Sequence, residues 1–144
     1  MLMNLREISL VKQTTKNNCV AACLSMVTGI GIETVEKELQ KANGVAPYHA
    51  EDYLKFLVRE NIYPEYSGRG MRELLSDDTI YLLLCSGSFN PASAHMVVGL
   101  MYKGQMQILD PSDDLENEKI YCSVKYNNGD IPVFQYISLT DCEI

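Results

Sequence analysis

The sequence predicts an α+β fold, with helices in the first half of the chain and an antiparallel sheet in the second half. Between residues 19 and 60, apolar residues recur at helical spacing. From residue 79 onwards they form short apolar or alternating runs that are separated by turn residues. No repeat, low-complexity tract or linker-like stretch divides the 144 residues, so we expect one domain over residues 1–144.

Three helices are expected before residue 61. The first covers Cys19 to Thr28 and stops at Gly29, because glycine readily takes the left-handed conformation that ends many helices. The second begins near residue 32 and ends at Asn43-Gly44, and the third covers about residues 50–60. The residues that these last two helices should bury are Ile32, Val35, Leu39, Tyr53, Leu54, Leu57 and Val58.

The rest of the chain is expected to form strands and turns. In order, we expect an extended piece at 62–66, a helical turn at 71–75, a buried strand at 79–85, a loop at 86–93, a hairpin of 94–102 with 105–109, and a hairpin of 120–126 with 131–139 that turns at 127–129.

The first hairpin allows its register to be predicted. If Lys103-Gly104 is a two-residue turn, Tyr102 faces Gln105 and Asp110 faces Val97. His95 and Asp110 then become diagonal neighbours on one face of the sheet, about 7 Å apart, a gap that their side chains can close. The opposite face carries apolar residues suited to a core: Met96, Val98 and Leu100.

Four residues in this arrangement suit a cysteine hydrolase. Cys19 stands at the start of a predicted helix, where the helix dipole and unpaired N–H groups stabilise a thiolate. His95 would take or return the proton, and Asp110 would hold the imidazole in the right tautomer. Gln13, on the extended segment Val11 to Thr15, can fold back so that its amide joins the backbone N–H of Cys19 in binding an oxyanion.

Two segments resemble the bacteriocin-processing cysteine peptidases that remove double-glycine leader peptides. The stretch from Val11-Lys12-Gln13 to Met26 is similar to their nucleophile segment, and the stretch from Ala94-His95 to Asp110-Pro111 is similar to their His/Asp segment. The residues between them resemble the family's paired helices, so that the similarity covers roughly residues 8 to 125. That family usually has Asp-Cys-Gly at the nucleophile, whereas this chain has Asn18-Cys19-Val20.

The resemblance implies a papain-like fold and a peptidase without a cofactor. Cys19 would be the nucleophile, His95 the base, Asp110 the orienting residue and Gln13 an oxyanion-hole donor. Cleavage would follow small residues, above all glycine, and would pass through a thioester. The substrate would be a peptide or protein, and the enzyme a monomer or weak oligomer.

Two other functions remain open at the level of sequence. The same thioester chemistry would release ammonia from a glutamine side chain, so the chain could be an effector that deamidates a host protein. Alternatively, the domain could hold a peptide without cutting it. An inert Cys19, or a Cys19 that lies beyond hydrogen-bond reach of His95, would favour this binding module.

Composition argues against several other classes of protein. The net charge of −7, with scattered Lys and Arg, is unlike a nucleic-acid surface. A metal site would need ligands that the Cys19/Cys23 pair and the two histidines do not supply, so no metal is expected. We interpret Cys23 and Cys85 as core residues and His49 as a residue at the start of a helix.

The sequence indicates a cytoplasmic protein. Charge interrupts the first residues too early for a secretory signal, and the apolar runs are too short to span a bilayer. Five cysteines at irregular spacing fit thiols in a reducing compartment better than a set of disulfides.

Overall fold

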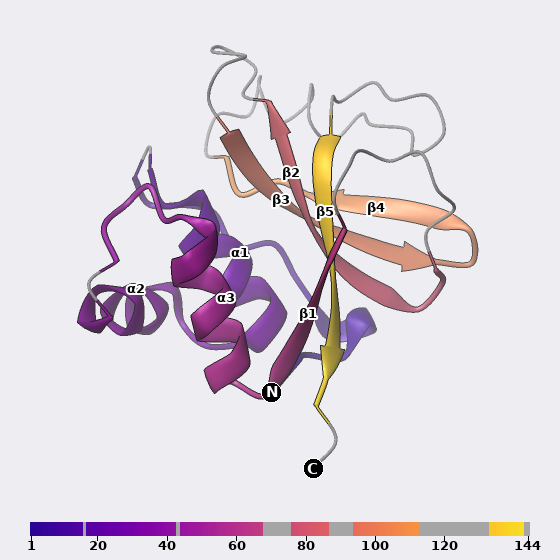
Figure 1. Cartoon of the computed structure of the whole chain (residues 1–144). Coiled ribbons are helices and arrows are strands. Elements are labelled where there is room, and N and C mark those ends of the chain that lie inside the picture. Colours follow the sequence, from indigo (N-terminus) through magenta and orange to yellow (C-terminus); the bar gives the residue numbers. More distant parts are fainter. Residues whose placement is uncertain (16, 43, 68–75, 87–93, 113–132, 143–144) are drawn as a thin grey trace.

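Three helices pack on one side of a five-stranded antiparallel sheet (Figure 1). The computed structural model describes residues 1–15, 17–42, 44–67, 76–86, 94–112 and 133–142. Its elements are the 3-10 helix η1 (Leu5–Glu7), the helices α1 (Cys19–Thr28), α2 (Ile32–Lys41) and α3 (Ala50–Arg59), and the strands β1 (Ile62–Ser67), β2 (Thr79–Ser86), β3 (Ala94–Tyr102), β4 (Gln105–Leu109) and β5 (Val133–Asp141). The predicted α+β class is confirmed.

The order of strands in the sheet differs from their order in the chain. It runs β1-β5-β2-β3-β4, and every neighbouring pair is antiparallel. The last strand, β5, therefore lies between β1 and β2 and pairs with both. This insertion places β5 in the interior of the sheet and leaves β1 and β4 at its two edges.

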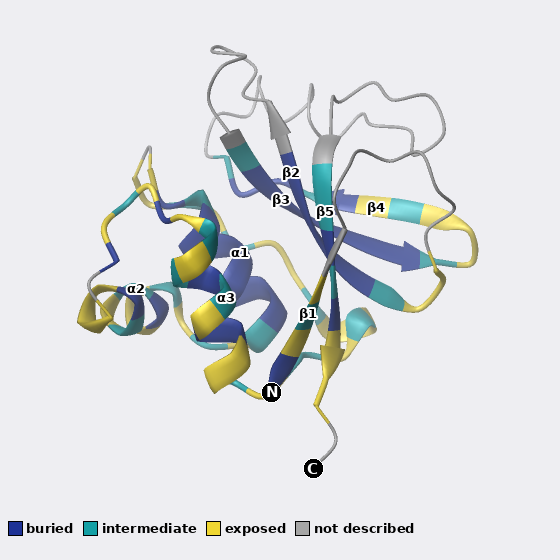
Figure 2. Cartoon of the chain, in the orientation of Figure 1, coloured by how far each residue is buried: buried dark blue, intermediate teal, exposed yellow. Residues whose placement is uncertain are grey.

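Helix α1 is the central helix of the molecule. Every residue from Val20 to Val27 is buried, because α2, α3 and β3 all pack against this helix (Figure 2). It ends at Gly29, whose φ of 76° is the left-handed conformation that the sequence predicts there. A helix buried on all sides holds its first residue, Cys19, in a fixed place.

Helices α2 and α3 each bury one face, as their spacing predicts. Val35 and Leu39 of α2 are buried, and α2 ends at Lys41, slightly before the predicted stop. The N–H of Gly44 still closes the turn by donating to the carbonyl of Leu39 at 2.8 Å. A side chain at position 44 would lie 2.7 Å from that carbonyl oxygen, so glycine is needed there.

The predicted buried face of α3 is wrong at one residue. Val58 is 60% exposed, whereas Phe56 is buried together with Tyr53 and Leu57. Positions 53, 56 and 57 share one face of a helix at spacings of three and four, and position 58 lies one step further around. Phe56 therefore joins the hydrophobic core, and Val58 lies on the exposed side of α3.

The β3–β4 hairpin has the register that the sequence predicts. Tyr102 pairs with Gln105 and Val98 pairs with Leu109. Lys103 and Gly104 have φ angles of 50° and 76°, and a two-residue turn with both φ angles positive matches the twist of the strands. Met96, Val98 and Leu100 face the core as predicted, and residues of the other face of β3, such as Val97, are buried too.

Some predicted elements lie outside the described residues. These are the helical turn at 71–75, most of the loop at 86–93 and the strand at 120–126 with its turn at 127–129. The second strand of that hairpin is present as β5, which covers residues 133–141. Across the described ranges, no single helix is long and apolar enough to cross a membrane; α1 and α2 would suffice only as a pair, and they meet at an angle of 114°.

Candidate active site

His95 and Asp110 meet at the open end of the β3–β4 hairpin. His95 is the second residue of β3, and Asp110 directly follows β4. Their side chains are joined by a contact of 2.7 Å between Nε2 and Oδ1. The backbone N–H of Ser112 donates to the same carboxylate oxygen at 2.9 Å, and Asp110 is buried. The carboxylate is thus held in one orientation, and it holds the imidazole ring in turn.

Cys19 lies beside His95. It is the first residue of α1, it is partly buried, and it is close enough to His95 to raise the pKa of that imidazole. Because Nε2 of His95 is bonded to Asp110, Nδ1 is the ring nitrogen left for the thiol. One turn along α1, the thiol of Cys23 donates to the carbonyl of Met96 at 3.3 Å and so links the helix to β3 beside His95.

The surroundings of His95 favour its charged form. Burial by itself lowers the pKa of His95, but the hydrogen bond to Asp110, the hydrogen bond to Cys19 and the charges of both partners raise it to about 9. The imidazole therefore carries a proton at neutral pH, between two groups that can be negative. An imidazolium beside a thiol favours the thiolate, which is the nucleophilic form of cysteine.

Gln13 lies next to Asp110, and its side chain forms a hydrogen bond with a residue close to it in the chain. Its backbone N–H donates to the carbonyl of Pro111 at 2.7 Å, which fixes the segment before α1 against the residue that follows Asp110. Its Nε2 donates to the carbonyl of Thr15 at 2.9 Å. An amide nitrogen carries two hydrogens, so this bond leaves a second donor on Gln13 for a ligand.

Asn18 is a buried polar residue beside the site that sequence analysis did not select. Its relative exposure is 0%, and its side chain bonds to Thr14, Thr15 and Glu36. A residue in this position usually caps the helix that follows, but the Asn18 side chain makes no such bond. The signal that could have identified it is its place directly before Cys19, the predicted nucleophile.

The comparisons with known proteins identify a fold. The sequence matches no protein-family model and no curated protein. Among solved structures, the chain is similar to the crystal structure of a double glycine motif protease from an AMS/PCAT transporter in complex with the leader peptide. The identity is 19%, the match covers 92% of this chain and 91% of that chain, and the TM-score is 0.62.

The chain shares the fold of that protease. The likeness extends over nearly the whole of both chains, so the papain-like fold that we expected is confirmed. At this level of identity the likeness is one of fold. The chemistry has to be argued from the side chains of Cys19, His95, Asp110 and Gln13 themselves.

The structure also describes two other cysteine side chains and the second histidine. Cys23 is buried, as expected of a core residue, and Cys142 is exposed. Cys122 and the side chain of Cys85 lie outside the described residues. His49 precedes α3 as its N-cap residue, as predicted. Among the described residues, no group of three or more His, Cys, Asp or Glu side chains could hold a metal ion.

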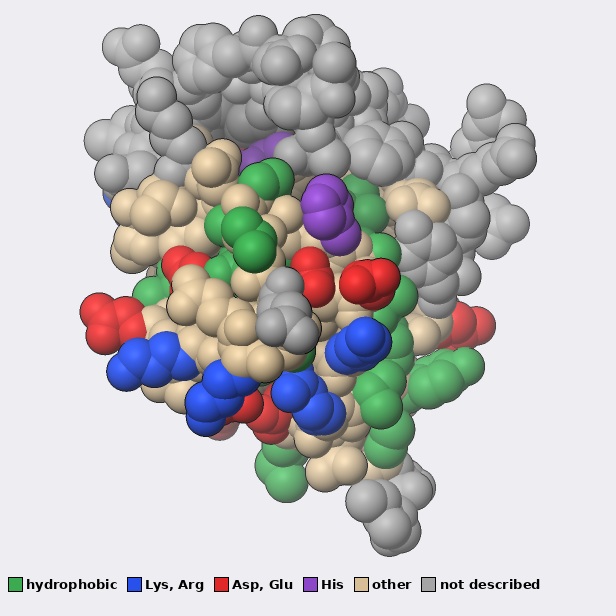
Figure 3. Space-filling model, turned by 60° about the vertical axis from the view of Figure 1, so that its left-hand side comes forward, with side chains coloured by type: hydrophobic (Ala, Val, Ile, Leu, Met, Phe, Trp, Pro, Cys, Tyr) green, Lys and Arg blue, Asp and Glu red, His purple; other side chains and the backbone are tan. Residues whose placement is uncertain are grey.

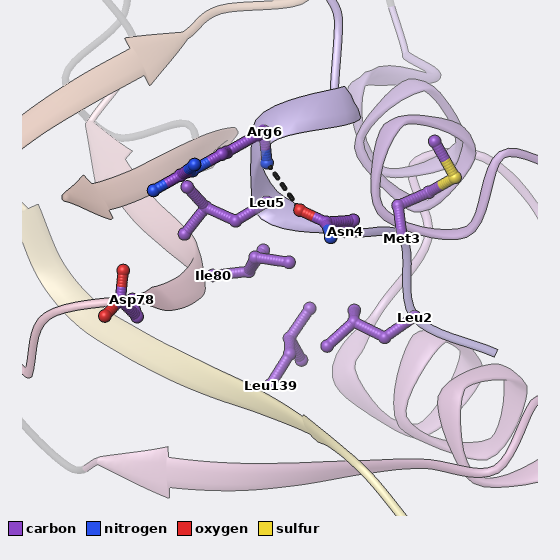
Figure 4. Close-up of a pocket in the computed structure, with 8 residues that line it drawn as sticks. All are labelled: Leu2, Met3, Asn4, Leu5, Arg6, Asp78, Ile80 and Leu139. Carbon is purple, nitrogen blue, oxygen red and sulfur yellow. Dashed lines mark hydrogen bonds between the residues drawn. The ribbon is translucent and has the colours of Figure 1, made fainter.

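A pocket on another part of the molecule lacks catalytic groups. It lies between the first residues of the chain and the strands β2 and β5 (Figure 4). Its lining is mostly apolar: Leu2, Met3, Asn4, Leu5, Arg6, Asp78, Ile80 and Leu139. It contains neither a thiol nor an imidazole, so the candidate active site remains the group around Cys19.

The helical face of the molecule carries charges of both signs (Figure 3). Helices α2 and α3 contribute both acidic and basic residues, and one pair of opposite charges joins Lys41 to Glu38 at 3.3 Å. A mixed surface of this kind is typical of solvated helices rather than of a phosphate-binding face.

Proposed function

We propose that the chain is a cysteine peptidase that uses Cys19 as its nucleophile. One observation carries the proposal: His95 lies beside Cys19 and bonds to the buried carboxylate of Asp110. This order of thiol, imidazole and carboxylate is the one that thiol catalysis requires. The contact between Cys19 and His95 also weighs against a binding module that does not cut.

The reaction has two steps. The Cys19 sulfur attacks the carbonyl carbon of the scissile bond, and His95 gives its proton to the leaving amine. Water then attacks the thioester, with His95 taking a proton from it, and the acid product leaves. In both steps the carbonyl oxygen becomes negative and accepts hydrogen bonds from the Cys19 N–H and the Gln13 amide.

We further propose that the substrate is a peptide or protein that is cut after a small residue, above all glycine. The protease of similar fold was solved with a leader peptide bound, and that protein is a double glycine motif protease. The same thioester could form from a glutamine side chain, so deamidation is the alternative outcome of the test.

The test compares the chain with Cys19→Ala on two kinds of substrate. One is a peptide set that carries Gly-Gly at the cleavage position, with Gly-Val and Val-Val peptides as controls. The other is a lysate analysed by intact-mass spectrometry. New termini after glycine that depend on Cys19 support the proposal, and Cys142→Ala serves as a matched thiol control.

Other results would overturn it. A target that stays unbroken while one glutamine amide becomes a carboxylate would identify a deamidase. Equal products from the chain and from Cys19→Ala, or none from either, would remove the peptidase assignment.

A further inference from the structure

The Asn18 side chain uses both ends of its amide within the fold. Its Oδ1 accepts hydrogen bonds from the backbone N–H groups of Thr14 and Thr15, both at 3.0 Å. Its Nδ2 donates to Oγ1 of Thr14 at 2.7 Å and to Oε1 of Glu36 at 2.6 Å. A fully buried amide with four partners fixes the backbone turn between Gln13 and Cys19.

Glu36 anchors this amide to α2. One carboxylate oxygen accepts from Asn18, and the other accepts from the hydroxyl of Tyr48, which is buried. Burial, the hydrogen bond to Glu36 and its charge raise the pKa of Tyr48 to about 12, so the hydroxyl stays a donor. The carboxylate thus has a donor on each oxygen, as a partly buried charge requires.

The turn that Asn18 holds leads directly to the candidate active site. The carbonyl of Thr15 accepts from the side chain of Gln13, and the backbone N–H of Gln13 donates to Pro111. At the other end, the carbonyl of Asn18 accepts the first backbone hydrogen bond of α1, from Ala22 at 3.1 Å. The Asn18 side chain therefore holds the segment that joins Gln13, the proposed oxyanion donor, to Cys19, the proposed nucleophile.

On this basis we propose that Asn18 is a positioning residue whose bond to Glu36 sets Gln13 and Cys19 at the distance that catalysis needs. The inference rests on the proposed function, because it assigns these two residues to the reaction. Asn18 itself does not touch the reacting atoms. It acts through the Thr14–Thr15 turn.

The pairing also explains why an amide suits position 18 in this chain. Aspartate would accept from Thr14 and Thr15 equally well, but its second oxygen would face the Glu36 carboxylate at the distance of a hydrogen bond. Two carboxylates that close repel each other unless one takes up a proton. Of these two side chains, only the amide can donate to a charged Glu36.

A charge exchange tests the pairing. Asn18→Asp places two carboxylates together, and we expect kcat to fall about 100-fold with KM little changed, since a small misplacement of catalytic groups costs this much. Adding Glu36→Gln supplies an amide that donates to the new carboxylate at position 18 and accepts from Tyr48. The double variant should recover most of the loss. Each protein is assayed at its own pH optimum, so that a change in ionisation is not read as misplacement.

Two further variants complete the experiment. Glu38→Gln removes a carboxylate from the exposed side of the same helix and should leave kcat unchanged. Glu36→Leu removes the acceptor of Asn18 without adding charge, and it should lower kcat in the same direction as Asn18→Asp. If Asn18→Asp does not fold, Glu36→Leu still tests the positioning role of Asn18.

Amide hydrogen exchange at Thr14 and Thr15 separates this inference from the proposed function. We expect faster exchange in Asn18→Asp and protection near the wild-type level in the double variant, whether or not any peptide is cleaved. A wild-type protein without turnover would overturn the proposed function alone. Wild-type kcat in both Asn18→Asp and Glu36→Leu, or a double variant that folds but shows neither recovered kcat nor recovered protection, would overturn the positioning role.

Discussion

Cys142 is the more exposed of two described thiols, but we expect Cys19 to react faster. Cys142 is exposed, whereas Cys19 is partly buried at the start of α1. Because His95 carries a proton beside Cys19, we expect iodoacetamide at neutral pH to alkylate Cys19 first. Peptide mass spectrometry over a time course measures both rates. Buried Cys23 should stay unmodified in the folded protein, and faster labelling of Cys142 would contradict the thiolate assignment.

Gln13 offers a second prediction at the residue scale. If its remaining amide hydrogen binds the oxyanion, Gln13→Ala should lower kcat by about 10²–10³ with KM nearly unchanged, the usual cost of losing one such donor. Steady-state kinetics on a cleavable peptide measure this. The matched control is Gln107→Ala, an exposed residue of β4 that should keep the wild-type rate. A Gln13→Ala enzyme at full rate would mean that other donors bind the oxyanion.

At the scale of elements, the β3–β4 hairpin reverses through two residues with positive φ angles, at the end opposite to His95 and Asp110. Gly104 has a φ of 76°, so Gly104→Ala should lower the free energy of unfolding by about 1–2 kcal/mol, the cost of placing a side chain in the left-handed region. Denaturant unfolding measures the loss. Gly31→Ala, at a position with ordinary backbone angles and open space, should change stability by no more than about 0.5 kcal/mol. Equal losses at the two positions would show that the turn angles do not limit stability.

The same hairpin shows what local patterns can predict. A two-residue turn determines its register, and the register determines that His95 and Asp110 are neighbours. The buried face of α3 was predicted less well, since positions 53, 54, 57 and 58 also recur at helical spacing and periodicity alone does not choose between Val58 and Phe56. The choice depends on which side chain the neighbouring sheet has room for.

For the whole molecule, the raised pKa of His95 links folding to pH. The pKa is about 9 in the folded protein against 6.5 for an unperturbed histidine, so the folded state holds this proton more tightly. The stability that this contributes is fully present below pH 6.5 and is lost as the pH rises through 9. We expect the difference in unfolding free energy between wild type and His95→Gln to shrink across this window.

Urea unfolding of both proteins from about pH 6 to about pH 9.5 measures that difference across the window of the linkage. His49→Gln, the substitution of the other histidine, shows whether the trend is specific to position 95. A difference that stays constant with pH would mean that folding does not change the pKa of His95.

The sequence by itself determined the local features of this protein. The helix that begins at Cys19, its end at Gly29 and the hairpin across Lys103-Gly104 follow from periodicity and turn residues. These features depend on contacts between residues close in the chain, which a single sequence shows directly.

The tertiary structure alone decided how distant segments meet. It placed β5 between β1 and β2, brought the first residue of α1 against His95, and joined Asn18 to Glu36 through a buried hydrogen bond. Each of these arrangements pairs groups that are far apart in sequence. The free energy that selects such pairs comes from burying surface and satisfying polar atoms across the whole core, and no local pattern records that balance.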